Sequence, residues 1–237
     1  MYLNASLPNL ELETSGASAI SSIDQMKITI FGATGALGSE CLTQALDAGH
    51  EVTVLIRSAS KLPDDSKKRI EVVEGDGLDA GDVAQALSEG TEAILFAVGV
   101  DKHSPEDLCT DVTRNILKAM VGSNIGRFVW CGGGSTLVEE DQVTFGARMV
   151  QKIAQVFMPL RHNDKEHQYQ LLKQHPEVDW IGVRPLQMRK GPKRAQYRLG
   201  FDAFNGLSVI TFADCAHAMV NMLEDDTWLR KAPIIQY

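Results

Sequence analysis

Short apolar runs alternate with amphipathic stretches through the first half of the chain. The runs are rich in β-branched and aromatic residues and are apolar on both sides, which is typical of strands buried in a parallel sheet. They span residues 27–31, 51–56, 70–73, 93–98 and 127–131. Helical spacing fills the intervals at 36–48, 79–87 and 104–121. The last of these helices is predicted to start with Ser104 as N-cap and Pro105 as its first residue.

This alternation predicts the fold class. Strands that alternate with helices indicate an α/β fold whose parallel sheet is covered on both sides. We expect a Rossmann-type, doubly wound, three-layer α/β/α domain with strand order 3-2-1-4-5 and further strands beyond. One domain is predicted over residues 26–237, because 237 residues suit a single large α/β domain. Residues 1–25 are rich in Ser and hold no Lys or Arg, and we predict a flexible tail there.

The second half of the chain follows a less regular pattern. Residues 145–157, 163–173 and 212–223 have helical spacing, 178–183 is an apolar strand, and 189–198 is a basic loop. We expect residues 135–198 to form a small irregular C-terminal region that makes much of the substrate wall, since loops on a rigid scaffold carry specificity.

A glycine-rich loop joins the first strand to the first helix. It reads Gly32-Ala-Thr-Gly35-Ala-Leu-Gly38. The first glycine permits a tight turn, the second lets the backbone approach a pyrophosphate, and the third lets the helix pack on the strand. Because the loop lies in a strand–helix–strand repeat, it predicts a dinucleotide site, with a turn that binds no ligand as the alternative. The residues expected to contact the cofactor here are Gly32, Thr34, Gly35, Ala36, Leu37 and Gly38.

The end of the second strand indicates which dinucleotide binds. An NAD site usually places Asp or Glu there to bind the ribose 2′-hydroxyl, whereas this chain has Arg57, followed by Ser58. A guanidinium pairs bidentately with a phosphate, and a carboxylate would repel it. No carboxylate follows along the chain until Asp64. We therefore predict NADP(H), with a solvated basic loop as the alternative.

Small residues follow the other predicted strands, as a cofactor site at their ends would require. The carboxylate of Asp76, after the third strand, either accepts from the adenine amino group or caps a turn. Small residues at the end of the fourth strand would let the cofactor pass closely, and a tight exit from the strand with no ligand is the alternative. The cofactor contacts predicted at these strand ends are Asp76, Gly77, Ala97, Val98, Gly99, Gly132, Gly133 and Pro185.

Together these motifs resemble the atypical short-chain dehydrogenase/reductases, and within them the group that holds NmrA-like proteins and biliverdin-IXβ and flavin reductases. The resemblance covers roughly residues 26–237 and implies a Rossmann sheet of about six or seven strands, with substrate bound over the nicotinamide by the C-terminal segments. The motifs that carry it are Gly32-x-x-Gly35-x-x-Gly38, Arg57, Gly75-Asp76, Thr113-Arg114-Asn115, Arg127-Phe-Val and Val183-Arg-Pro185.

The chain departs from that family at the catalytic motif. Many members carry Tyr-x-x-x-Lys, in which Tyr is the acid–base, but here Arg161 stands at the Tyr position and Lys165 at the Lys position. The resemblance makes Lys165 a cofactor-ribose ligand and Ser135 a catalytic residue; an exposed helical lysine is the alternative for Lys165. Cys131 is predicted to be a buried strand-end residue.

No metal site is predicted. His162 and His167 are five residues apart, which on a helix points them to different faces.

The missing Tyr also bears on the reaction. Reductases of the flavin type need little acid–base help, because bound NADPH donates hydride and the protein mainly positions two rings. We therefore expect an NADP(H)-dependent oxidoreductase of reductase type, which transfers hydride to a small planar or carbonyl acceptor such as a flavin or quinone. A non-catalytic NADP(H)-binding redox sensor is the alternative. A sugar-nucleotide epimerase or dehydratase is the third possibility, and the missing Tyr disfavours it.

Composition narrows the choice of partners. A net charge of −8 repels nucleic acid and anionic membranes at long range, so we expect a small-molecule substrate and neither of those partners. No apolar run reaches the roughly 18 residues that span a bilayer. The four cysteines form no Cys-x-x-Cys pair, which favours a reducing cytoplasm. The chain is expected to be a monomer or a homodimer.

Overall fold

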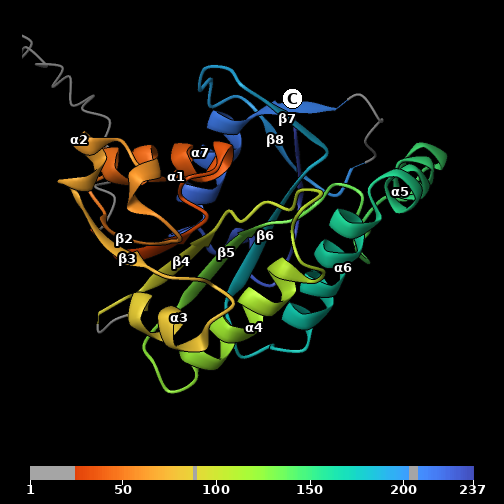
Figure 1. Cartoon of the computed structure of the whole chain (residues 1–237). Helices are drawn as coiled ribbons and strands as arrows, with labels where there is room; N and C mark the ends of the chain where they lie inside the picture. The colour runs from red at the N-terminus through yellow and green to blue at the C-terminus, as the bar shows by residue number, and fades with distance from the viewer. Residues whose placement is uncertain (1–24, 88–89, 203–207) are drawn as a thin grey trace, which may run out of the picture.

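Helices cover both faces of a central sheet (Figure 1). The computed structural model describes residues 25–87, 90–202 and 208–237, so the predicted tail lies outside the described residues except for Gln25. The elements in chain order are β1 (Lys27–Phe31), α1 (Ala36–Asp47), β2 (Glu51–Ile56), η1 (Ala59–Lys61), α2 (Asp64–Lys67), β3 (Ile70–Glu74), α3 (Ala80–Ala86), β4 (Ala93–Phe96), α4 (Leu108–Met120), β5 (Arg127–Cys131), α5 (Phe145–Phe157), α6 (Pro159–Lys173), β6 (Trp180–Pro185), β7 (Gln187–Arg189), β8 (Arg198–Gly200), β9 (Val209–Thr211), α7 (Phe212–Asn221), η2 (Asp226–Trp228) and β10 (Ile234–Gln236).

The sheet has the order predicted for a doubly wound fold. Within the described residues, eight strands lie in the order β3-β2-β1-β4-β5-β6-β10-β8. All neighbours pair in parallel except β8, which runs antiparallel to β10 at the edge. The predicted order 3-2-1-4-5 and the Rossmann-type class are confirmed. The sheet is one strand wider than expected, because β8 and β10 extend it beyond β6, and β7 and β9 form a separate parallel pair.

Two apolar cores, one on each face, hold the three layers together. Successive side chains of a strand point to opposite faces. In β4, Leu95 packs in the core under α1 and α7, whereas Ile94 and Phe96 pack in the core under α3, α4 and α6. Figure 1 shows the same division, with α1 and α7 on one face and α3 and α4 on the other. This explains why the strands are apolar on both sides in the sequence.

The start of α4 differs from the prediction. The helix begins at Leu108 and not at Ser104, because Ser104 is used in a turn in which its hydroxyl accepts from the amide of Asp101 at 3.0 Å. The cap of α4 comes from another element, α6. The carboxylate of Asp164 accepts from the amides of Cys109 and Thr110 at 2.8 and 2.9 Å. A cap supplied from so far along the chain leaves no local signal in the sequence.

Two other helices also have different ends from those predicted. Met158 is not helical and separates α5 from α6. The helix α6 therefore begins at Pro159, four residues before the predicted start, because proline is favoured in the first turn of a helix. The late helix α7 ends at Asn221 and not at residue 223. The helix α5 has the predicted bounds.

Candidate cofactor and substrate site

A cavity lies at the carboxyl ends of β1 to β4. Its volume is about 620 Å³, within the range usual for sites that bind small molecules. In open α/β sheets ligands bind at this edge, where the strand order reverses, and here β1 and β4 are neighbours at that point. Nine residues predicted to contact the cofactor line the cavity, namely Gly32, Thr34, Gly35, Arg57, Asp76, Gly77, Ala97, Val98 and Gly99.

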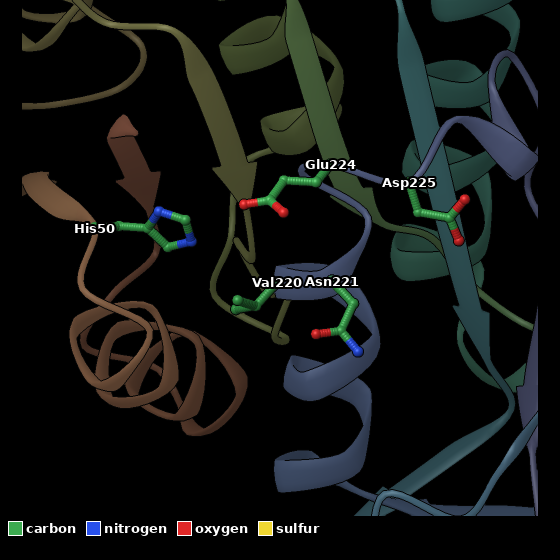
Figure 2. Close-up of a pocket in the computed structure, with 5 residues that line it drawn as sticks. All are labelled: His50, Val220, Asn221, Glu224 and Asp225. Atoms are coloured by element: carbon green, nitrogen blue, oxygen red, sulfur yellow. The ribbon is translucent and has the colours of Figure 1, made fainter. Parts of the chain in front are cut away.

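A smaller hollow of about 260 Å³ lies at the opposite, amino-terminal edge of the sheet (Figure 2). His50, just before β2, faces Val220 and Asn221 of α7 across it, and Glu224 and Asp225 complete its wall. The carboxylates of Glu224 and Asp225 would repel the phosphates of a dinucleotide, so this hollow is unsuitable for one. We therefore place the candidate cofactor site at the carboxyl edge of the sheet.

The glycine loop has the geometry that a dinucleotide requires. Gly32 has a φ of +86°, and a Cβ atom there would lie 2.8 Å from the backbone of Ala97. A Cβ atom on Gly38 would lie 2.0 Å from the carbonyl oxygen of Gly32, so the third glycine allows the helix to pack on the loop. Gly35 caps α1 without a side chain, and the first turn of α1 holds no acidic residue. The N-terminus of α1 therefore adjoins the cavity with no side chain at its cap and no acidic group in its first turn. This arrangement fits a pyrophosphate group.

Side chains of the loop contribute unequally. Thr34, Gly35 and Ala36 are exposed at the cavity or beside it, whereas the side chain of Leu37 is buried in the core under α1 and α7. Leu37 can reach a cofactor only through its main chain.

The end of β2 brings Arg57 to the cavity together with a carboxylate that the sequence did not suggest. Arg57 is exposed and lines the cavity. The hydroxyls of Ser58 and Ser60 lie 2.9 Å apart, and the amide of Ala59 donates to Oε1 of Glu74 at 2.6 Å. Glu74 ends the neighbouring strand β3, so its carboxylate lies beside the predicted phosphate pocket although it is 17 residues from Arg57. No carboxylate follows Arg57 along the chain until Asp64, but the pairing of β2 with β3 brings Glu74 close to it in space.

The turn after β3 is held by its own side chains. Asp76 is exposed, and its Oδ1 accepts from the amide of Leu78 at 3.0 Å, while its own amide donates to Asp82 at 2.8 Å. Asp76 thus caps a turn, which was one of the two predicted roles. Its contact with adenine stays a prediction.

The loop between β4 and α4 forms a wall of the cavity that the sequence did not predict. Asp101, His103, Ser104 and Pro105 line the cavity, and the last two of them were predicted to open a helix. Because Ser104 and Pro105 were predicted to start the helix, no cavity wall was expected from them. Ser and Pro are also common in turns, so the two residues alone do not distinguish a turn from a helix start.

A second cluster of predicted residues lies at the carboxyl end of β5. Lys165 of α6 is only 5% exposed, so the expectation of an exposed helical lysine is wrong. Its ammonium group donates to Oε1 of Gln168 at 3.1 Å and to the carbonyl oxygen of Val98 at 3.4 Å. A Cβ atom on Gly133 would lie 3.7 Å from the Cβ of Lys165 and 3.9 Å from Oγ of Ser135. Lys165, Ser135 and the main chain of Gly133 therefore meet, and Lys165 contacts the cavity wall through Val98.

Ser135 has a partner, His162, which in the sequence was a candidate only for binding a metal. Its Oγ lies 3.0 Å from Nδ1 of His162, a buried residue of α6. Burial lowers the pKa of His162, against the opposing charge of Glu166, so the imidazole is neutral at neutral pH. His167 is exposed and pairs with Asp107 at 2.7 Å, which confirms that the two histidines point to different faces.

A buried ion pair fixes the loop that carries Ser135. Arg184 of β6 and Asp141 lie 2.5 Å apart, and their side chains are 0% and 2% exposed. Arg184 also donates to the carbonyl oxygens of Thr136 and Ala232. The main chain of Gly134 donates to the carbonyl oxygen of Pro185 at 2.9 Å, so residues 132–136 are tied to the end of β6. Gly132, Gly133 and Pro185 lie at this edge and do not line the cavity.

The remaining candidate groups have structural roles. Cys131 is buried, as predicted, and so are the other three cysteines, all of which are free. Among the described residues, no group of three or more His, Cys, Asp and Glu side chains is arranged to hold a metal ion. None of the described helices is both long enough and apolar enough to cross a bilayer.

Comparison with known proteins decides the family. The family model for NAD(P)H-binding proteins matches residues 32–226. The chain belongs to the NAD(P)H-binding family. The protein YwnB of Bacillus subtilis (strain 168) is 27% identical to this chain over 207 residues, which are 84% of this chain and 92% of YwnB.

Solved structures agree with that assignment. A candidate epimerase from Bacteroides thetaiotaomicron has a TM-score of 0.74 at 26% identity, over 90% of this chain and 97% of that one. A candidate NADH-flavin reductase from Streptococcus pneumoniae TIGR4 has a TM-score of 0.72 at 23% identity, over 89% and 99%. At that identity the second likeness shows the fold alone. The predicted resemblance is thus confirmed at the level of the NAD(P)H-binding family. Both neighbours share the fold of this chain.

Proposed function

We propose that the chain is an NADP(H)-dependent reductase that transfers hydride to a small planar or carbonyl acceptor. The observation that carries the proposal is the meeting of Lys165, Ser135 and His162 beside Gly133, at the edge of a cavity that suits a dinucleotide. When bound, the cofactor supplies the hydride. The protein's own residues then have to hold the acceptor and supply a proton.

The cofactor proposed is NADP(H) and not NAD(H). Arg57 occupies the position at which NAD sites carry a carboxylate, and it lines the cavity. Ser58, Ser60 and Lys61 follow it and offer further donors. Glu74 opposes a phosphate by its charge, but its Oε1 already accepts from the amide of Ala59. We infer that the guanidinium of Arg57 binds the 2′-phosphate and that Glu74 holds the loop that presents it.

Ser135 is the residue we propose as the proton donor. Its hydroxyl would donate to the oxygen or nitrogen that gains charge as hydride arrives on the acceptor. Nδ1 of His162 would return a proton to Oγ, while Nε2 takes one up from water, so that the imidazole stays neutral overall. Lys165 would place a positive charge beside the cofactor ribose, since its ammonium already lies 3.4 Å from the carbonyl oxygen of Val98. This arrangement would replace the Tyr that is absent at Arg161.

The test is anaerobic oxidation of NADPH by the purified full chain, offered a flavin, a quinone and an aldehyde in turn. We expect oxidation with at least one acceptor. For an aldehyde, Ser135→Ala should lower kcat by about a hundredfold, because positioned acids contribute about 10²- to 10⁴-fold. The exposed Ser123→Ala variant should not change it. Tight NADPH binding with no turnover of any acceptor would contradict the proposal.

A non-catalytic NADP(H) sensor is the second candidate, because one observation favours it. The cavity is lined by residues of the first four strands, the loops after them and the start of α4, and by none from 135 to 198. A site that binds only the cofactor needs no more than this. The same experiment separates the two functions, since a sensor binds NADPH without oxidising it.

The wider setting is inferred from the same features. We propose a small-molecule substrate and a cytoplasmic location, because every cysteine of the chain is free and buried, as is usual in a reducing compartment.

A further inference from the structure

The helix α5 exposes an apolar face that none of the described residues covers. Among those residues ten large apolar side chains are exposed, and seven of them lie between residues 143 and 158. Phe145, Val156 and Phe157 are 79%, 70% and 77% exposed. Figure 1 shows α5 at the rim of the molecule, beside α6 and away from the sheet. Such a concentrated patch on a soluble surface marks a place where something apolar binds.

The residues of α5 divide into three sectors around the helix axis. Ala147 and Ala154 are buried, and Val150 packs with Ala147 and with Ile234 of β10. Phe145, Met149 and Val156 follow helical spacing along one outward row, and Ile153 and Phe157 widen it. Arg148 and Lys152, four residues apart, run along the edge of this apolar row. The helix therefore has its apolar row turned outward, with cations along one border.

The charge of this segment is opposite to that of the whole chain. From residue 142 to residue 163 the sequence holds Arg148, Lys152 and Arg161, all exposed, and no Asp or Glu. The net charge of −8 comes from the rest of the chain. An apolar face bordered by Lys and Arg is the pattern of helices that lie in the plane of a membrane interface, where the cations reach anionic headgroups.

We propose that α5 docks the protein on the surface of a bilayer that carries anionic phospholipid headgroups. The apolar row enters the boundary between headgroups and acyl chains, while Arg148 and Lys152 contact phosphates at its border. A second copy of the chain fits less well, because a symmetric contact of two such helices would bring like charges together. The proposal departs from the expectation of no membrane partner, since the net charge averages over the chain and hides this local segment. It does not depend on the proposed function.

The experiment is co-sedimentation of the full chain with vesicles of phosphatidylcholine alone and of phosphatidylcholine and phosphatidylglycerol in equal parts. Wild type should sediment with the anionic vesicles, and high salt should weaken this binding. The double variant Phe145→Ser, Phe157→Ser should bind them at least about tenfold more weakly, because two exposed rings no longer enter the lipid. Arg148→Gln with Lys152→Gln should weaken binding about tenfold as well, and only to the anionic vesicles.

A matched control comes from α4 and the residue that follows it. Lys118 and Val121 are exposed there, and Lys118→Gln with Val121→Ser makes the same kinds of change away from α5. This variant should bind as wild type does. Thermal unfolding checks that each variant folds, and light scattering reports its oligomeric state. Absence of binding to the anionic vesicles, equal loss in the α4 variant, or a wild-type dimer that the Phe145→Ser, Phe157→Ser variant dissociates would overturn the proposal.

Discussion

The two halves of the candidate site are built from different parts of the chain. The adenosine half, at the ends of β1 to β4, consists largely of main chain: glycine turns and the N-terminus of α1. The substrate half, at the end of β5, consists of side chains such as Ser135, His162 and Lys165, which come from a loop and from α6. A site made of main chain is encoded in a short, continuous motif. A site made of side chains depends on how distant elements pack.

Breaking the buried ion pair of the substrate half should have the largest effect. Asp141→Asn leaves Arg184 charged and without its partner in the core. We expect unfolding in urea to show a loss of about 3–5 kcal/mol, as is usual when one member of a buried pair is removed. The exposed pair of Arg230 and Asp179 is the control, and Asp179→Asn should cost at most about 1 kcal/mol. Equal losses in the two variants would show that Arg184 is solvated after all.

The glycine loop should respond next, and in two distinct ways. Gly38→Ala places a Cβ atom 2.0 Å from the carbonyl oxygen of Gly32, so the helix must shift, at a cost of about 1–3 kcal/mol or more. Gly35→Ala places a Cβ atom 3.3 Å from the same oxygen, which is tight but can be relieved. We expect Gly35→Ala to keep most of the stability and to weaken dinucleotide binding. Urea unfolding and calorimetric titration of the same samples measure both quantities; a Gly38→Ala protein as stable as wild type would contradict the account.

The sequence predictions succeeded for features that a short stretch of chain encodes and failed for features that depend on the packing of distant elements. The strand order and the glycine loop could be predicted because their signals are local: apolar runs, a turn, and a spacing of three residues. Glu74 could not be found beside Arg57, since only the pairing of β2 with β3 brings them together. The start of α4 was misplaced because its cap, Asp164, lies on α6.

The burial of Lys165 and the contact of His162 with Ser135 were missed for the same reason. Both lie on a polar helix whose sequence has little apolar pattern, and their surroundings are set by the loops after β4 and β5. A lysine or histidine on such a helix is exposed more often than not, and only the packing decides otherwise.

Acid should have the smallest effect on stability. Burial lowers the pKa values of His50, His162 and His217 in the folded protein. The unfolded chain binds these protons near pH 6.5, so below about that pH it holds more protons than the folded state and stability falls. Above it stability should stay level. Urea midpoints from about pH 7.5 to about pH 5.5 measure the slope, and His162→Asn should flatten it; a midpoint that rises on acidification would contradict the sign.

The central claim is that Arg57 gives this NAD(P)H-binding protein its preference for the phosphorylated cofactor. The most direct test is calorimetric titration of NADPH and NADH into wild type and Arg57→Ala. A charge-assisted hydrogen bond contributes about 1.5–3 kcal/mol, so the variant should bind NADPH about ten- to a hundredfold more weakly and NADH almost unchanged. Glu74→Gln, which can still accept from Ala59, should strengthen NADPH binding alone. Equal wild-type affinity for the two cofactors, or equal losses in Arg57→Ala, would show that Arg57 does not bind the phosphate.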